Sequence, residues 1–277
     1  MSQTIIITGA SDGIGAAAAR QLSAKGEHVI VVGRSPAKTA AVAKELNSPY
    51  HVADFTDLAQ VRRLASELLA AYPRIDVLAN NAGGLFKKTR TTDGFEKTFQ
   101  VNHLAGFLLT NLLMERLLES KAKVIQTSSI GAKVFGHIDL DDFTRFTTKN
   151  AMYAYGDSKL ANILFTKELH RRYHARGLSA VAFHPGNITS NFAHDYRFVQ
   201  VIYRSPIRFL LETPAAGGAR LAWLAQGTPG ETWQSGEYYE NNKIPPAWKI
   251  NSQAKDADLA RALWERSEAL LGLNASA

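Results

Sequence analysis

The fold is decided by residues Thr4–Gly15, which read TIIITGASDGIG. The β-branched run Thr4–Thr8 predicts a buried strand, and apolar residues at helical spacing predict a helix over Ile14–Lys25. Glycines between the two elements permit a tight turn and let a ligand approach the backbone closely. Because the amide groups at a helix N-terminus attract anions, we expect this turn to bind a phosphate group.

The same alternation of strand and helix continues along the chain. β-branched runs predict further strands at Val29–Val32, Tyr50–Val52, Val77–Ala79, Lys123–Thr127 and Ser179–Phe183. Apolar residues three and four apart predict helices at Pro36–Leu46, Leu58–Ala71, Phe95–Leu118 and Tyr153–Ala175. Such repetition gives a parallel sheet with helices on both faces. We therefore predict an α/β fold, a doubly wound Rossmann-type sheet, as one domain over residues 1–277.

Composition narrows the class of protein. The absence of cysteine excludes disulfides, thiolate zinc sites and a cysteine nucleophile. Lysine and arginine total 32 against 25 aspartates and glutamates, but this net charge of +7 is spread without a basic block, so we expect no nucleic-acid partner. No run approaches about 20 apolar residues, and the start of the chain shows no export signal. We therefore expect a cytoplasmic protein.

Residues of the turn and of the next strand end form a candidate cofactor site. The turn contributes Gly9, Ser11, Asp12, Gly13, Ile14 and Gly15. After the second strand stands Arg34, where a carboxylate would bind a ribose 2′-hydroxyl, and its guanidinium suits a 2′-phosphate. This favours NADP(H) over NAD(H), although Asp12 adds an opposing charge. An ordinary glycine-rich turn and a solvated arginine are the competing interpretations.

Later strand ends extend this site. Asp54, with Phe55 beside it, is placed to accept a hydrogen bond from an adenine amino group, or else to cap a helix near Thr56. Small residues after the fourth strand would let a cofactor lie against the backbone, although a simple turn also explains them. The candidates there and at the end of the fifth strand are Asn81, Ala82, Gly83 and Thr127.

Tyr155 and Lys159 are the candidate acid–base pair. Four residues apart on a predicted helix, they share one face, and an ammonium beside a phenol favours the phenolate. Ser129 supplies a hydroxyl for a substrate oxygen, and Asn102 is placed to anchor a water that contacts Lys159. Taken singly, each has a structural explanation as surface, capping or packing residue. His137 and the aspartates near it lack matched ligands elsewhere, so we expect no metal.

Together these motifs resemble the short-chain dehydrogenase/reductase family. The similarity covers Thr8–Gly15, Asn80–Gly83, Asn102, Ser129, Tyr155–Lys159 and the His-Pro-Gly sequence His184–Gly186. It implies a catalytic tetrad of Asn102, Ser129, Tyr155 and Lys159, with Tyr155 and Lys159 also contacting the cofactor. It further implies that Pro185, Gly186 and Ile188 face the nicotinamide, and that Ser190 binds a phosphate or amide.

A closer resemblance is to the branch with retinol dehydrogenases, WW-domain oxidoreductases and protochlorophyllide reductases. It rests on Ser158–Phe165, His184–Gly186 and the tail from Ser235–Tyr239 to Trp264. The segment 130–151 before Tyr155 is long, as in that branch, and is expected to be an active-site loop. The sequence lacks a membrane anchor, a WW domain and the cysteines associated with protochlorophyllide reduction, so the resemblance does not extend to retinoid or chlorophyll substrates. A homo-oligomer on the Phe95–Leu118 and Tyr153–Ala175 helices is implied, unless the long loop obstructs it.

The segment 191–211 mixes aromatic and aliphatic residues with three arginines. We expect a substrate lid, because loops at the carboxyl ends of strands carry ligands in such folds. The alternatives are a half-buried helix, or a basic amphipathic segment that rests on a membrane surface or on a partner subunit. The sequence thus predicts an NADP(H)-dependent oxidoreductase that interconverts an apolar ketone or aldehyde and its alcohol. The alternative is a non-catalytic NADP(H)-binding redox sensor.

Overall fold

The computed structural model describes residues 2–142, 151–188 and 212–273. Its centre is a parallel sheet of seven strands in the order β3-β2-β1-β4-β5-β6-β7. The strands are β1 Thr4–Thr8, β2 His28–Gly33, β3 Tyr50–Val52, β4 Val77–Asn80, β5 Lys123–Thr127, β6 Ser179–His184 and β7 Tyr238–Glu240. Strand order reverses between β1 and β4, and at such a point the carboxyl ends of the strands leave a crevice for a ligand.

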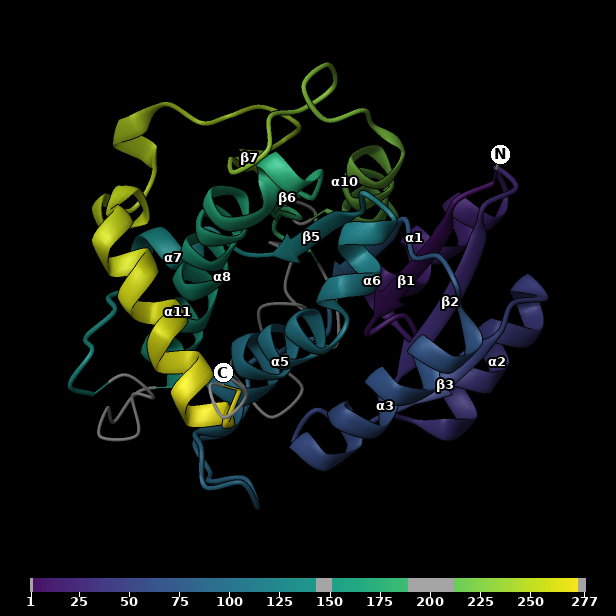
Figure 1. Ribbon diagram of the computed structural model, residues 1–277, viewed down its shortest axis with the longest axis horizontal. Helices are drawn as coiled ribbons and strands as arrows, with labels where there is room; N and C mark the ends of the chain where they lie inside the picture. Colours follow the sequence, from purple (N-terminus) through teal and green to yellow (C-terminus); the bar gives the residue numbers. More distant parts are fainter. Residues whose placement is uncertain (1, 143–150, 189–211, 274–277) are drawn as a thin grey trace, which may run out of the picture.

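Helices cover both faces of the sheet, as the sequence predicted (Figure 1). One face packs against α3 Leu58–Ala71, α5 Ala105–Leu112 and α8 Ala151–Tyr173. The other packs against α1 Gly13–Ser23, α2 Pro36–Leu46 and α10 Pro214–Gln226. Strands such as β1 are buried on both faces, which explains why their sequences are continuously apolar. The predicted doubly wound architecture is therefore confirmed.

The predicted single helix over Phe95–Leu118 is wrong. The chain instead forms α4 Lys97–Phe99, a π-helical turn at Gln100–Leu104, α5, and α6 Met114–Glu119. Glu96 is the N-cap of α4, because its carboxylate accepts a hydrogen bond from the backbone N–H of Phe99 at 2.8 Å. The π turn is the widest form of helix and is frequent at functional sites. Here it carries Asn102, one of the predicted site residues.

The C-terminal helix α11, Ala257–Leu271, packs along α8 (Figure 1). Its buried Trp264 lies 4.9 Å from Phe107 of α5 and 5.5 Å from Phe165 of α8, measured between ring centres. The side of α5 and α8 that Trp264 contacts is therefore occupied by the chain's own helix. None of the helices in the described ranges is both long and apolar enough to span a membrane.

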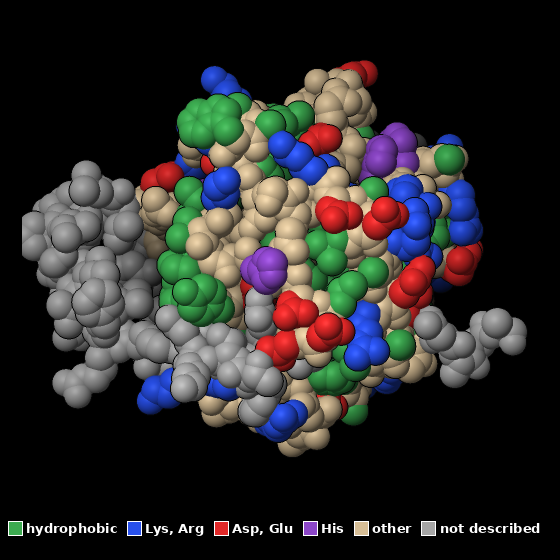
Figure 2. Space-filling model, turned by 90° about the vertical axis from the view of Figure 1, so that its left-hand side faces the viewer, with side chains coloured by type: hydrophobic (Ala, Val, Ile, Leu, Met, Phe, Trp, Pro, Cys, Tyr) green, Lys and Arg blue, Asp and Glu red, His purple; other side chains and the backbone are tan. Residues whose placement is uncertain are grey.

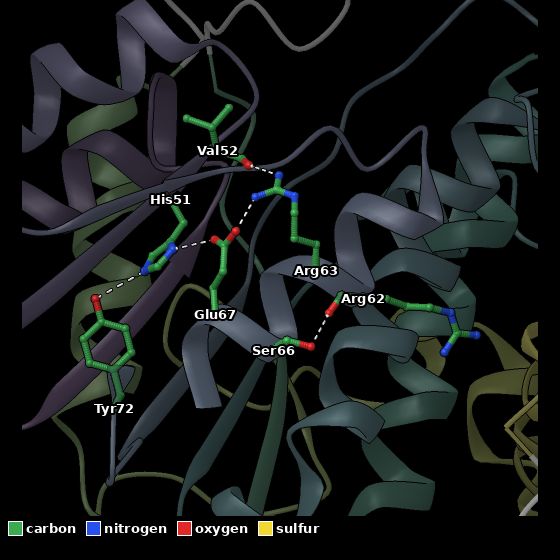
Figure 3. A network of polar contacts seen from close by, with 7 residues as sticks. All are labelled: His51, Val52, Arg62, Arg63, Ser66, Glu67 and Tyr72. Carbon is green, nitrogen blue, oxygen red and sulfur yellow. Dashed lines mark hydrogen bonds and ion pairs between the residues drawn. The ribbon is translucent and has the colours of Figure 1, made fainter. Parts of the chain in front are cut away.

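Polar contacts fasten the edge strand β3 to α3 (Figure 3). His51 Nδ1 lies 3.0 Å from Glu67 Oε2, and Arg63 pairs with the same carboxylate while donating a hydrogen bond to the carbonyl of Val52 at 2.8 Å. The hydrogen bonds from His51 and Arg63 lower the pKa of Glu67. Since β3 ends just before Asp54, this network fixes where the chain enters the site.

Charged side chains of both signs are mixed on the face of the molecule that Figure 2 shows. On the face in Figure 2, basic and acidic side chains are interspersed among apolar and neutral ones. This matches a net charge of +7 that the sequence spreads along its length.

Candidate active site

A cavity of about 850 Å³ lies at the carboxyl ends of β1, β2, β4, β5 and β6. Most of the residues that the sequence singled out line it. They are Gly9, Ser11, Asp12, Gly13, Ile14, Gly15, Arg34, Asp54, Phe55, Asn81, Ala82, Gly83, Thr127, Ser129, Tyr155, Lys159, Pro185, Gly186 and Ile188. Asn102 lies behind the cavity wall, while Ser190 and the segment 191–211 fall outside the described residues.

The turn after β1 is built for close approach. Gly9 has φ +67°, and a Cβ on Gly15 would lie 2.4 Å from the carbonyl oxygen of Gly9, so neither position accepts a side chain without rearrangement. Helix α1 begins at Gly13 and points its first turn at the cavity. The glycine-lined cradle and the helix N-terminus fit a cofactor pyrophosphate. Asp12 caps the helix through Gly13 N.

The ends of β1 and β4 are tied together beside this turn. Thr8 Oγ1 donates a hydrogen bond to the carbonyl of Ala79 at 3.2 Å and accepts from the backbone N–H groups of Asn81 and Ala82, each at 3.0 Å. The Asn81 side chain returns a bond to the Thr8 carbonyl, also at 3.0 Å. Thr127 Oγ1 lies 3.3 Å from Asn81 Oδ1 and continues the network to β5. These bonds hold the strand ends that form the cavity floor.

Two cations lie at the cavity edge between the end of β2 and the first turn of α2. Arg34 is exposed and lines the cavity, and Lys38, in the first turn of α2, lines it as well. Lys38 Nζ lies 3.0 Å from Asp12 Oδ2, so the negative charge of Asp12 is compensated. The sequence interpretation missed Lys38, although its spacing of four residues from Arg34 was a usable signal.

Asp54 lies in the turn that joins β3 to α3. Its side chain accepts a hydrogen bond from Thr56 N at 2.9 Å within the turn before α3, whereas the N-cap of α3 is Asp57, whose side chain accepts from Ala59 N at 3.0 Å. Asp54 also lines the cavity next to Phe55, at the carboxyl end of β3. Asp54 is therefore not the cap of α3, and its contact with adenine stays a prediction.

Tyr155 and Lys159 lie one turn apart on α8 and both face the cavity. The Nζ of Lys159 is 5.6 Å from the centre of the Tyr155 ring and donates a hydrogen bond to the carbonyl of Thr127 at 3.0 Å. Lys159 is 4% exposed, and this burial lowers its pKa to about 8. A cation of reduced proton affinity therefore stands beside a phenol.

The two adjacent serines after β5 have different surroundings. Ser128 is buried, and its hydroxyl donates to the backbone carbonyl of Lys159 at 2.7 Å. Ser129 is half-buried, and its hydroxyl accepts from Gly131 N at 3.0 Å. A Cβ on Gly131 would lie 2.9 Å from Tyr155 Cε1 and 3.4 Å from Ser129 Oγ, so these two side chains flank one glycine. Ser129 is the serine that can meet a substrate oxygen near Tyr155.

Asn102 supports the site from behind. Its Nδ2 donates to the carbonyl of Gly84 and to Ser158 Oγ, both at 3.0 Å, while its Oδ1 accepts from Gly84 N at 2.8 Å. A Cβ on Gly83 would lie 2.8 Å from Asn102 Oδ1 and 3.3 Å from Lys159 Nζ. Asn102 therefore lies next to Lys159, but both of its side-chain N–H groups are used to hold the protein.

The cavity wall near Tyr155 is largely apolar. Phe86, Ile130, Phe135 and Met152 line it, and the sequence interpretation singled out none of them. His184 lies there too, where burial and then the charge of Arg220 lower its pKa to about 4, so its imidazole is neutral at pH 7. Of the long segment 130–151, Ile130, Gly131 and Phe135 line the cavity, and residues 143–150 fall outside the described ranges.

Arg220 of α10 fastens the loop after β6. It donates to the carbonyl of Pro185 and pairs with Glu212, both at 2.6 Å, and it donates to Asn241 Oδ1 at 2.7 Å. Three separate segments thus meet at one guanidinium beside Gly186. The sequence interpretation missed Arg220, because it lies 35 residues from Pro185 and only the fold brings them together.

The chain is similar to known proteins over most of its length. A family model described as short chain dehydrogenase matches residues 3–198. The protein named "Putative daunorubicin C-13 ketoreductase DnrU" from Streptomyces sp. (strain C5) is 40% identical, over 98% of this chain and 93% of its own. Human retinol dehydrogenase 13 is 37% identical, over 99% of this chain and 86% of its own.

Solved structures agree. An uncharacterised protein from Mycobacterium paratuberculosis superposes with a TM-score of 0.75 and 33% identity, over 98% of this chain and 93% of that one. A short chain dehydrogenase from Shigella flexneri 2a, solved in complex with NADP, has a TM-score of 0.67 and 25% identity, over 86% and 96% of the two chains. Both likenesses extend over most of the sheet and its helices.

Proposed function

The chain belongs to the short-chain dehydrogenase family, and from this premise we propose that it is an NADP(H)-dependent oxidoreductase that interconverts an apolar ketone or aldehyde and the corresponding alcohol. The observation that carries the proposal is the pair formed by Tyr155 and the buried Lys159, which face one cavity beside Ser129. Relatives named for a ketone and for retinol support chemistry on carbonyl and alcohol groups.

Ser129, Tyr155 and Lys159 each have a separate role in the reaction. When the cofactor is bound, its nicotinamide supplies or accepts the hydride. Ser129 donates a hydrogen bond to the substrate oxygen as negative charge develops on it. Tyr155 gives its phenolic proton to that oxygen during reduction and takes a proton back during oxidation. Lys159 stabilises the phenolate that Tyr155 forms, because its ammonium lies close to the ring.

The residues of the crevice support NADP(H). The glycine cradle after β1 accommodates a pyrophosphate, and Pro185, Gly186 and Ile188 line the far end of the cavity. Arg34, just after β2, and Lys38, in the first turn of α2, offer two positive groups at the cavity edge, where a 2′-phosphate would lie. The Shigella flexneri relative was itself solved with NADP. We assign the preference for NADP(H) over NAD(H) to these two cations.

The wall around Tyr155 supports an apolar substrate. Phe86, Ile130, Phe135 and Met152 present aromatic and aliphatic side chains, and His184 is neutral. A pocket of this kind binds a ligand mainly through burial of its apolar surface and orients it with few polar groups. The substrate carbonyl is then the group that Ser129 and Tyr155 hold.

Turnover of a panel of apolar ketones and aldehydes, with NADPH and NADH compared side by side, tests the proposal. Tyr155→Phe should lower kcat by about 10²-fold or more while the affinity for NADPH changes little, since general acid catalysis is worth about 10²–10⁴-fold. Tyr153→Phe is the matched control, because Tyr153 is on the same helix and 48% exposed. Equal turnover in the Tyr155 variant would overturn the assignment.

The same panel separates the enzyme from a redox sensor. In stopped-flow experiments the enzyme should oxidise bound NADPH when a carbonyl substrate is added. A sensor would bind NADPH tightly, yet lose no hydride to any member of the panel.

A further inference from the structure

The stretch Ser158–Phe165 contains a buried polar residue, Asn162, to which catalysis as described gives no role. Its Nδ2 donates hydrogen bonds to two backbone carbonyls, that of Asn102 at 3.0 Å and that of Thr127 at 3.2 Å. The Thr127 carbonyl is the same one that accepts from Lys159 Nζ at 3.0 Å. Asn162 and Lys159 therefore share an acceptor directly behind the acid–base pair.

His103 fixes the orientation of this amide. Its Nδ1 lies 3.1 Å from Asn162 Oδ1. Because Nδ2 of Asn162 is the donor to both carbonyls, Oδ1 must accept, so Nδ1 of His103 carries the hydrogen. Burial lowers the pKa of His103 to about 4, which keeps the ring neutral at pH 7. The rings of Phe99, Phe107 and Phe165 surround it, with centres 5.3 to 6.0 Å away.

We propose that Asn162, oriented by His103, is a positioning residue that holds Lys159 close to Tyr155 and thereby keeps the proton affinity of Tyr155 low. The inference rests on the proposed function and extends it to a residue that touches neither substrate nor cofactor. Its physical basis is competition for the ammonium: the two carbonyl oxygens that Asn162 satisfies are attractive partners for a buried cation. With both satisfied, Lys159 keeps its place beside the phenol.

Removing the side-chain amide of Asn162 should change the position of the Lys159 ammonium. In Asn162→Leu, of similar size, the Asn102 carbonyl loses this donor and the Thr127 carbonyl keeps the one from Lys159. The ammonium is then drawn inward, away from the Tyr155 ring, and the phenolate loses stabilisation. His103→Phe should act in the same direction but less strongly: phenylalanine fits the aromatic surroundings, and the loss of the donor to Asn162 Oδ1 lets the amide turn and weakens its two carbonyl contacts without removing them.

The first measurement is the ionisation of Tyr155 in the cofactor-free protein, followed by ultraviolet difference titration. Each spectrum is referenced to the same protein carrying Tyr155→Phe, which isolates one phenol among the nine tyrosines. Asn162→Leu should raise the midpoint by about one pH unit, equivalent to about tenfold in proton affinity. The titration requires neither substrate nor NADPH. It therefore tests the role of Asn162 even if no ketone or aldehyde of the substrate panel is reduced.

The second measurement is the pH profile of kcat for alcohol oxidation. The variant should lose about tenfold in rate at pH 7 and recover the wild-type plateau at higher pH, with KM for NADP unchanged within about threefold. A merely structural role would lower the plateau without moving the midpoint. Thr166→Val is the matched control, since it removes a buried hydroxyl of the same helix that donates to the backbone carbonyl of Asn162 at 2.8 Å.

These outcomes decide the proposal. A raised Tyr155 midpoint in Asn162→Leu, with Thr166→Val unchanged, supports it. If Asn162→Leu does not fold, the same titration of His103→Phe replaces it. An unshifted midpoint in the folded variants, or an equal shift in the control, overturns the proposal.

Discussion

The Nζ of Lys159 lies 5.6 Å from the centre of the Tyr155 ring, and both side chains are buried. Proximity favours the phenolate, because a positive charge stabilises the negative one that forms. Burial works against the ammonium itself and brings the pKa of Lys159 down to about 8 from an ordinary value of 10.5. The position of Lys159 therefore serves the chemistry and opposes the stability of the fold.

Lys159→Met should abolish turnover and yet stabilise the cofactor-free protein at pH 7. Below pH 8 the native state holds a charged amine that burial disfavours, and removing it gains up to about 3 kcal/mol, at about 1.4 kcal/mol per pH unit of displacement. Between pH 8 and 10.5 the unfolded state binds more protons than the native state, so the wild type gains stability as pH rises. Urea unfolding at pH 7 and pH 10 measures both effects.

The advantage of Lys159→Met should accordingly shrink at pH 10. Lys167→Met is the control, because Lys167 is on the same helix with a side chain 30% exposed. Its free energy of unfolding should stay within about 1 kcal/mol of the wild type, as expected for a weak surface pair. A Lys159 variant that is less stable at pH 7, or equally advantaged at both pH values, would contradict the argument.

The strands were predicted well from the sequence, because parallel strands buried on both faces consist of continuous runs rich in β-branched residues. β1, β3 and β5 have the predicted bounds, while β2, β4 and β6 are longer by one residue at one or both ends. The cavity residues could be predicted from the strands, because the carboxyl ends of parallel strands lie at one edge of the sheet. The three-residue β7 gave no separate signal, and neither α10 nor α11 was predicted.

What failed depends on tertiary contacts. The apolar spacing of Phe95–Leu118 does not distinguish a regular helix from one with a wide turn at Gln100–Leu104. That turn carries Asn102, whose side chain bonds Gly84, eighteen residues away. The contact between Arg220 and the Pro185 carbonyl could not be predicted either, because the two residues are 35 positions apart in the sequence.

Cofactor choice should depend on Arg34 and Lys38. Arg34→Ala is expected to raise KM for NADPH by about tenfold or more and to leave KM for NADH nearly unchanged, because a hydrogen bond to a charged group contributes about 1.5–3 kcal/mol. Lys38→Ala should act less strongly, since Lys38 already pairs with Asp12. Steady-state kinetics with both cofactors measure the ratio.

Arg20→Ala is the control for that series. Arg20 is an exposed cation on α1 that pairs with Glu45 and is absent from the cavity wall, so its loss should affect both cofactors equally. An unchanged NADPH to NADH ratio in Arg34→Ala would assign cofactor selection to other residues.

Arg220 should set the position of the nicotinamide end of the cofactor site. Arg220→Met leaves the Pro185 carbonyl, Glu212 and Asn241 without this guanidinium, so the loop after β6 loses the contact that joins it to α10. We expect NADPH to bind about tenfold more weakly, with 2′-phospho-ADP-ribose, which lacks the nicotinamide, bound as in the wild type. Calorimetric titration with both ligands separates these effects. Arg261→Met, on the exposed side of α11, should change neither affinity. Equal weakening for both ligands would mean that Arg220 supports the whole fold and has no particular effect on the loop at Pro185.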